Sequence, residues 1–229
     1  MVVRSKRYRE AAAKVDRNKT YEPQDAIQLI KDLPAAKFDE SVEVVIQLGI
    51  DPRKTDQLVR GAVSLPKGLG RDVRVVVFAE GEKAEQAKAA GADEVGSAEL
   101  ADKIQGGWMD FDIVITSPDM MRHVGKLGKV LGPQGKMPSP KSGTVTPDVA
   151  NAVTEFKAGK VEFRTDAGGN VHAPVGKRSF STEDLVANLE AFLNHVEGMR
   201  PPAVKGSFLR RVCLSTTMGP GVRLSTGGI

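Results

Sequence analysis

Two short stretches carry the side chains best suited to close polar contact with a partner. The first, STTMGPGVR at 215–223, combines hydroxyls, small residues and an arginine, without an acidic side chain. Small residues let another backbone approach closely, hydroxyls form hydrogen bonds, and guanidinium groups pair with phosphates. These groups suit contact with the sugars and phosphates of a folded nucleic acid. The stretch is equally compatible with a plain chain end that frays from a sheet edge.

The second stretch, AKFDESVEV, places complementary groups at the start of a predicted strand. Lys37 offers a cation to phosphates, while Ser41 and Glu43 offer a hydroxyl and a carboxylate to ribose 2′-hydroxyls. Phe38 lies between them. Aromatic residues make up only 5% of the chain, and no aromatic pair has strand-face spacing on a basic strand. If the partner is RNA, we therefore expect recognition of shape, phosphates and 2′-hydroxyls rather than base stacking.

The charge distribution supports a polyanionic partner for part of the molecule. The net charge is only +4, but residues 71–119 hold eleven acidic side chains against five basic ones. Residues 120–147 and 198–229 contain no acidic side chain at all. Basic segments on both sides of an acidic middle favour a polyanion as partner, and an unevenly charged solvated surface is the alternative.

The hydrophobic pattern changes twice along the chain. Alternation at 41–50 and 58–65 predicts strands that each bury one face. A central region then follows the order strand, helix, short strand, helix, strand, helix, which is typical of a parallel α/β sheet. Its predicted elements are 73–79, 81–91, 93–96, 98–105, 111–117 and 118–131, followed by a Gly/Pro-rich basic loop and a helix at 149–159.

The first pattern returns after Lys160. Strands are predicted at 160–166 and 170–176, around a hairpin turn at Gly168-Gly169-Asn170, and another strand at 207–216. A helix is predicted at 181–198, where Ser181 with Asp184 resembles a capping box.

The strands before Pro66 need partners, since an isolated pair of strands is rarely stable, and the strands after Lys160 can supply them. We therefore predict a mixed fold, α+β and α/β, with two domains. A discontinuous α+β domain comprises 1–66 and 160–229, and a Rossmann-like parallel α/β domain at 67–159 is inserted into it. Hinges are expected near 66–72 and 158–160.

A nucleotide-binding α/β enzyme is the alternative function, but its motifs are incomplete. The turn after the strand at 73–79 has only Gly81, so the dinucleotide fingerprint is missing. GPQGKM resembles a P-loop, yet Val130 replaces its first glycine and Met137 its Ser/Thr. We therefore expect no cofactor and no enzymatic activity.

Other function classes find little support in the sequence. The three histidines, His123, His172 and His195, are widely spaced, and the single Cys213 excludes an intramolecular disulfide and a multi-Cys zinc site. We expect no metal site. The N-terminal residues 1–16 are basic without an apolar run, and no apolar stretch is long enough to span a membrane. These features predict a soluble cytoplasmic protein.

Seven motifs together resemble the family of bacterial large-subunit ribosomal protein one, the proteins of the mobile stalk beside the tRNA exit site. They span nearly the whole chain in order, and the combination of LGPQGKMPSPK with a terminal TTMGP is specific. The motifs are SKRYR, AKFDESVEV, LGIDPRKTDQLVRGAVSLPKGLG, GWMDFDIVITSPDMM, GKLGKVLGPQGKMPSPKSGTV, VEFRTDAGGNVHAPVGK and TTMGP.

The resemblance implies that the discontinuous domain binds a folded region of large-subunit (23S) rRNA. The implied RNA-binding residues are Lys37, Phe38, Ser41, Glu43, Asp166, Thr217, Met218 and Gly219. The family usually has Thr where this chain has Ser41, which keeps the hydroxyl. It often has Lys where this chain has Ala167, so a possible phosphate contact is missing beside Asp166.

The resemblance also implies several partners and a location. The family acts in the cytoplasm as a constituent of the large ribosomal subunit and aids release of deacylated tRNA from the exit site. It represses translation of its own operon by binding an mRNA segment that mimics the rRNA site. A monomer is expected when the protein is free of the ribosome, without a membrane partner.

Overall fold

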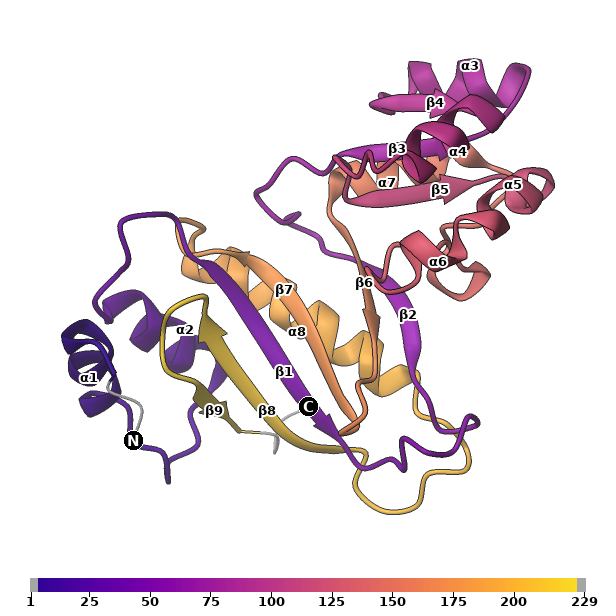
Figure 1. The fold of residues 1–229 in the computed structure, drawn as a ribbon. Helices are drawn as coiled ribbons and strands as arrows, with labels where there is room; N and C mark the ends of the chain where they lie inside the picture. The colour runs from indigo at the N-terminus through magenta and orange to yellow at the C-terminus, as the bar shows by residue number, and fades with distance from the viewer. Residues whose placement is uncertain (1–3, 226–229) are drawn as a thin grey trace. The chain divides into compact units, whose positions relative to one another are not determined.

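The computed structural model describes residues 4–225, which group into two compact units (Figure 1). Of the described residues, 4–70 and 161–225 belong to the first unit and 71–160 to the second. The outermost residues of the predicted discontinuous domain, 1–3 and 226–229, lie outside the described part. Residues 1–3 also begin the basic N-terminal segment 1–16, which we expect not to be a secretory signal. No helix in the described part is long and apolar enough to cross a membrane.

A four-stranded antiparallel sheet forms the centre of the first unit. Its strands lie in the order β7 (Asn170–Lys177), β1 (Ser41–Leu48), β8 (Leu209–Thr216) and β9 (Val222–Leu224). The predicted alternation in β1 is confirmed, because Val42, Val44, Ile46 and Leu48 are buried while the residues between them are not. Since side chains alternate across a strand, those residues between them lie on the opposite face of the sheet.

Two helices, α2 (Pro23–Asp32) and α8 (Thr182–Gly198), pack against the apolar face of this sheet. Pro23 occupies the first turn of α2, and the Ser181 hydroxyl caps α8 by accepting a hydrogen bond from the Asp184 N–H at 3.0 Å. This bond confirms the predicted cap at Ser181. The Asp184 carboxylate accepts the Ser181 hydroxyl at 2.6 Å, whereas the reciprocal bond of a full capping box would come from the Ser181 N–H. A shorter helix, α1 (Lys6–Ala13), buries only Ala11 among its own residues.

The predicted hairpin around Gly168-Gly169-Asn170 is wrong as a strand pairing. β6 (Lys160–Arg164) pairs with β2 (Arg60–Ser64), whereas β7 pairs with β1. Between the two halves of the expected hairpin only the bridge between Thr165 and Val171 remains. Local turn chemistry does place a tight turn here, with Gly169 at φ 77°, but the more distant β1 and β2 are the actual partners.

The C-terminal stretch does not fray from the sheet. Residues 217–221 form a turn, and β9 returns along β8, with Cys213 paired to Arg223. Pro220 is buried. No strand is predicted at β9 from the sequence, since its three residues are too few to show alternation.

The second unit contains a parallel three-stranded sheet, as predicted. Its order is β4 (Glu94–Gly96), β3 (Val75–Phe78) and β5 (Ile113–Thr116). All four residues of β3 are buried, as expected for the central strand of a sheet covered on both faces. The helices that pack in this unit are α3 (Glu82–Ala89), α4 (Ala98–Gln105), α5 (Met121–Lys126), α6 (Gly128–Leu131) and α7 (Val149–Ala158).

The continuous helix predicted at 118–131 is wrong in detail. The segment divides into a 3-10 turn at Pro118–Met120, then α5 and α6, with Leu127 between them at φ −83° and ψ 0°. Gly125 and Gly128 lower the helix propensity at this break. The content of helices and of both sheet types confirms the predicted mixed fold class. The boundaries at 66 and 160 and the two hinges stay predictions.

Candidate nucleic-acid interface

The structure brings together seven of the eight predicted contact residues at one end of β1. We call them the strand-end surface: Lys37, Phe38, Ser41, Glu43, Thr217, Met218 and Gly219. They come from the loop that enters β1, from the first residues of β1 itself and from the turn that leaves β8. The turn is far from the other two segments in the sequence. Antiparallel pairing places the start of β1 beside the end of β8, because Val42 pairs with Thr216.

One buried carboxylate holds the two loops of this surface in place. Glu40 is fully buried. Its Oε1 accepts the N–H of Ala36 at 2.6 Å, and its Oε2 accepts the N–H of Met218 at 3.1 Å. A single side chain therefore satisfies the backbone of both segments, since each would otherwise leave a donor unpaired near the core.

The environment of Glu40 keeps it ionised. Burial raises the pKa of this carboxyl, but hydrogen bonds from the Thr216 hydroxyl and from the Ala36 and Met218 N–H groups lower it, as does the charge of Arg7. The lowering effects are the larger in sum, so the pKa lies below its ordinary value.

Arg7 connects α1 to the same carboxylate. Its Nη1 donates to Glu40 Oε1 at 3.2 Å and to the Pro34 carbonyl at 3.3 Å, while its Nη2 donates to the Met218 carbonyl at 3.3 Å. This gives the SKRYR motif a structural role, because its first arginine bridges both loops of the strand-end surface.

Two predicted hydroxyls already make contacts within the protein. The Thr217 hydroxyl accepts the Ser41 N–H at 3.0 Å, and the Thr217 N–H donates to the Ser41 carbonyl at 3.0 Å. The Ser41 hydroxyl accepts a hydrogen bond from Lys177 Nζ at 3.0 Å. Both hydroxyls thus fix the surface geometry. Their remaining oxygen lone pairs and the Ser41 hydroxyl proton are available for hydrogen bonds to a ligand.

Gly219 is required for a steric reason within the turn. A Cβ atom at this position would overlap the Oγ1 atom of Thr216, whose hydroxyl is bonded to Glu40. The turn closes through a hydrogen bond from the Gly219 N–H to the Thr216 carbonyl at 3.1 Å. The glycine therefore protects the Glu40 network as well as leaving the surface bare.

We expect Gly219→Ala to lower the free energy of unfolding by about 1–3 kcal/mol, because the added methyl overpacks this turn. Gly221→Ala is the matched control: a Cβ there has no neighbour within 4 Å, so its effect should stay within about 0.5 kcal/mol. Urea unfolding of both variants measures the difference. Equal stability of the two variants would contradict the steric role of Gly219.

The remaining side chains of the surface are open to a partner. Phe38 and Met218 are 55% and 51% exposed, and with Leu58 they are the large hydrophobic residues exposed within the described part. Lys37 and Glu43 are also exposed, and neither side chain has a hydrogen-bond or ion-pair partner among residues 4–225. Two apolar groups, a cation and a carboxylate suit sugars, phosphates and 2′-hydroxyls together.

Asp166 lies away from the other predicted contact residues. Along β1 and β7, Ser41 pairs with Lys177 and Gln47 with Asn170, so the two ends are about 20 Å apart at ~3.4 Å per residue. The Asp166 N–H donates to the Asn170 carbonyl, which places Asp166 at the far end. Its carboxylate accepts the N–H groups of Asn170 at 2.7 Å and Gly168 at 2.8 Å, and it lies 3.3 Å from His172 Nε2.

These contacts make Asp166 a pH-dependent turn cap. Hydrogen bonds from the Asn170 backbone and side chain lower its pKa to about 2 from an ordinary value of 3.8, with smaller contributions from His172 and Gly168. A depressed folded-state pKa gives stability that is present above about pH 4 and is lost as the pH falls toward 2. Because the side chain is 41% exposed, screening limits the contribution to about 1 kcal/mol or less.

We therefore expect Asp166→Asn to be less stable than the native chain at pH 6 by up to about 1 kcal/mol. The difference should shrink between pH 4 and pH 2. Urea unfolding at several pH values checks this, and a constant difference down to pH 2 would contradict the cap.

Two residues that organise the surface, Glu40 and Arg7, are missing from the set predicted from the sequence. Glu40 precedes the alternation of β1 and follows another acid, Asp39, so it resembles a solvated charge. Its position directly before a strand, in a motif otherwise rich in contact residues, is the one local signal for its role.

The described side chains show no metal centre: within residues 4–225, no three His, Cys, Asp or Glu residues gather closely enough to bind an ion. Cys213 lies in β8 as a free thiol. His195 packs edge-on against Phe163, with ring centroids 5.9 Å apart.

Comparison with known proteins agrees with the resemblance. A family model described as the ribosomal protein L1p/L10e family matches residues 29–220. The large ribosomal subunit protein uL1 of Kosmotoga olearia is 57% identical over 224 residues, covering 98% of this chain and 97% of that protein. The protein of the same name from Polynucleobacter asymbioticus is 58% identical over 225 residues, with the same coverages.

Proposed function

Because this chain belongs to the ribosomal protein L1p/L10e family, we propose that it is a cytoplasmic constituent of the large ribosomal subunit whose strand-end surface binds folded rRNA. It is a non-enzymatic protein, as the sequence predicts. The observation that supports the binding role best is the pair of exposed apolar side chains, Phe38 and Met218, in two loops that one buried carboxylate holds together.

Each group has a distinct role in this proposal. Met218 and Phe38 pack on riboses, and Glu43 accepts a 2′-hydroxyl, which separates RNA from DNA. Lys37 neutralises phosphate and adds affinity that depends on salt. The hydrogen bonds between Thr217 and Ser41 preorganise these groups, so little conformational entropy is lost on binding.

Gel-shift titration against the stalk rRNA fragment, with an unrelated hairpin at the same salt concentration as control, tests the proposal. We expect clearly tighter binding to the stalk fragment. Equal affinity for both RNAs would exclude this function.

We further propose that the same surface binds the chain's own operon mRNA and so represses its translation. The leader RNA should then compete with the stalk fragment for one site in the titration. Absence of competition would separate the two activities. We also propose that the protein aids release of deacylated tRNA and is a monomer when free of the ribosome.

Hinges near 66–72 and 158–160 complete the proposal. Solution scattering of the free and the RNA-bound protein tests whether the two units move at these hinges.

A further inference from the structure

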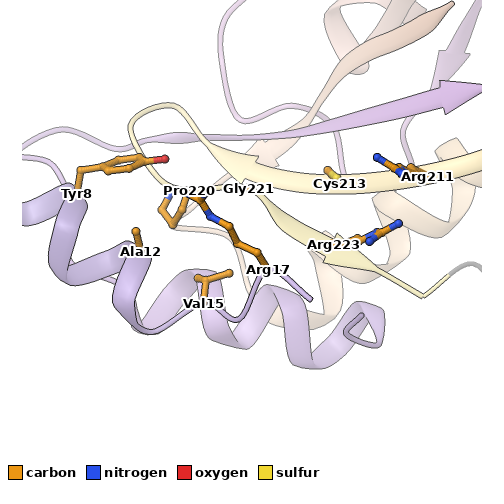
Figure 2. A pocket seen from close by; sticks show the side chains of 9 residues that line it. All are labelled: Tyr8, Ala12, Val15, Arg17, Arg211, Cys213, Pro220, Gly221 and Arg223. Carbon is orange, nitrogen blue, oxygen red and sulfur yellow. The ribbon is translucent and has the colours of Figure 1, made fainter. Parts of the chain in front are cut away.

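A second basic site adjoins the turn at 217–221. An open pocket of about 320 Å³ lies among α1, this turn and the strands β8 and β9 (Figure 2). Three of its nine lining residues are arginines, and none of the nine is acidic. The lining residues are Tyr8, Ala12, Val15, Arg17, Arg211, Cys213, Pro220, Gly221 and Arg223.

The sheet itself positions two of the arginines. Arg223 pairs with Cys213, and Arg211 is two residues from Cys213 on β8, so all three lie on one face. The alternate residues Val212, Leu214 and Val222 are buried against the helices on the other face. Arg211 and Arg223 are therefore diagonal neighbours, with Cβ atoms roughly 7 Å apart.

The segment after α1 positions the third arginine. Tyr21 is tied to β9 by hydrogen bonds from its N–H to the Arg223 carbonyl at 2.9 Å and from the Ser225 N–H to its carbonyl at 2.8 Å. Figure 2 shows Arg17 reaching from this segment toward Pro220. The Tyr8 ring borders the same space and stacks with Arg4, whose Cζ lies 5.0 Å from the ring centroid.

These guanidinium groups are not used for structure. Within residues 4–225, the side chains of Arg17, Arg211 and Arg223 have no hydrogen-bond or ion-pair partner. Arg7, by contrast, is fully engaged with Glu40 and backbone carbonyls. Three uncompensated cations around one pocket repel each other, so the arrangement favours an anionic ligand.

We propose that this pocket binds consecutive phosphodiester groups of the RNA that the strand-end surface contacts. This inference rests on the proposed function, since it extends that interface. The guanidinium group of arginine forms paired hydrogen bonds with phosphate oxygens. Three arginines around one pocket therefore suit several consecutive phosphates better than one isolated phosphate. Arg223 follows Gly219 by four residues, which span at most about 14 Å even if fully extended, so one RNA helix can reach both places.

Salt-dependent binding of the stalk rRNA fragment by the full chain tests the pocket. In the pocket variant, Arg17, Arg211 and Arg223 are all changed to Gln. Its negative slope of log K against log salt should become shallower by about 2–3, that is ~0.7–0.9 per lost contact. Preference over the unrelated hairpin should change little, because phosphate contacts carry no sequence information. A control with Arg53, Lys54 and Lys205 changed to Gln removes the same charge from exposed positions outside the pocket and should keep the native slope.

The outcomes separate this inference from the proposed function. If the native chain prefers the stalk fragment and both triple variants share its slope, the pocket assignment is wrong while the function stands. If the native chain shows no preference, the function fails first. Calorimetry with inorganic phosphate tests whether the pocket binds a free anion instead. The assignment to RNA would be overturned if the pocket variant alone lost saturable phosphate binding while its salt slope for RNA stayed unchanged.

Discussion

Glu40→Gln should lower the free energy of unfolding by about 3 kcal/mol. The substitution removes the negative charge that faces Arg7 at 3.2 Å. The glutamine amide also carries an N–H₂ group in place of one carboxylate oxygen. Either the Ala36 N–H or the Met218 N–H would then face a donor where it now has an acceptor. Breaking a buried pair by changing one partner typically costs ~3–5 kcal/mol, and the effect here lies at the lower end because the Arg7 side chain is 27% exposed.

Urea unfolding followed by far-UV circular dichroism measures this effect, and Glu43→Gln is the matched control. Glu43 carries the same charge three residues away but is exposed, so its stability change should stay within about 0.5 kcal/mol. Amide hydrogen exchange should also become faster in the Glu40 variant for peptides containing residues 36–40 and 216–219. Native stability of Glu40→Gln would show that this carboxylate does not hold the two loops.

Met218→Asp should weaken binding to the stalk rRNA fragment by about 1–3 kcal/mol, roughly five- to 150-fold in affinity, while leaving the fold intact. Met218 is 51% exposed, so the change costs the protein little burial. In the complex it replaces an adaptable apolar contact with a negative charge facing sugars and phosphates.

Leu58→Asp provides the control for this charge change. Leu58 is exposed to a similar extent, 41%, and precedes β2 in the same unit, outside the strand-end surface. Both variants add one negative charge, so any effect of net charge alone appears equally in the two titrations. Equal loss of affinity would assign the effect to overall charge and remove Met218 from the interface.

Local sequence patterns were sufficient to predict most elements but not their long-range pairing. Alternation in β1, the Ser181 cap of α8 and the strand-helix order of the second unit are all local signals, and each is confirmed. The pairing of β6 with β2 is not local, because about 100 residues separate the two strands. The glycine turn before Asn170 therefore predicts a hairpin between β6 and β7, but the two strands pair instead with β2 and β1, which are distant in the sequence.

The candidate surface shows the same division between local and non-local information. The predicted contact residues lie in short motifs, and the structure shows that Lys37, Phe38 and Met218 among them are exposed. Glu40 and Arg7 act through contacts 178 and 211 residues away in the sequence, to Met218, and no local pattern reveals those. The contacts of the Thr217 and Ser41 hydroxyls with the Ser41 backbone and with Lys177 are equally non-local.

Amide hydrogen exchange of the full chain, with and without the stalk rRNA fragment, shows directly whether the strand-end surface is the RNA interface. We predict slower exchange on RNA binding in peptides covering 36–43 and 215–221, and unchanged exchange in the exposed loop at 51–58. Protection confined to the second unit, or no protection at the strand-end surface under saturating RNA, would contradict this assignment.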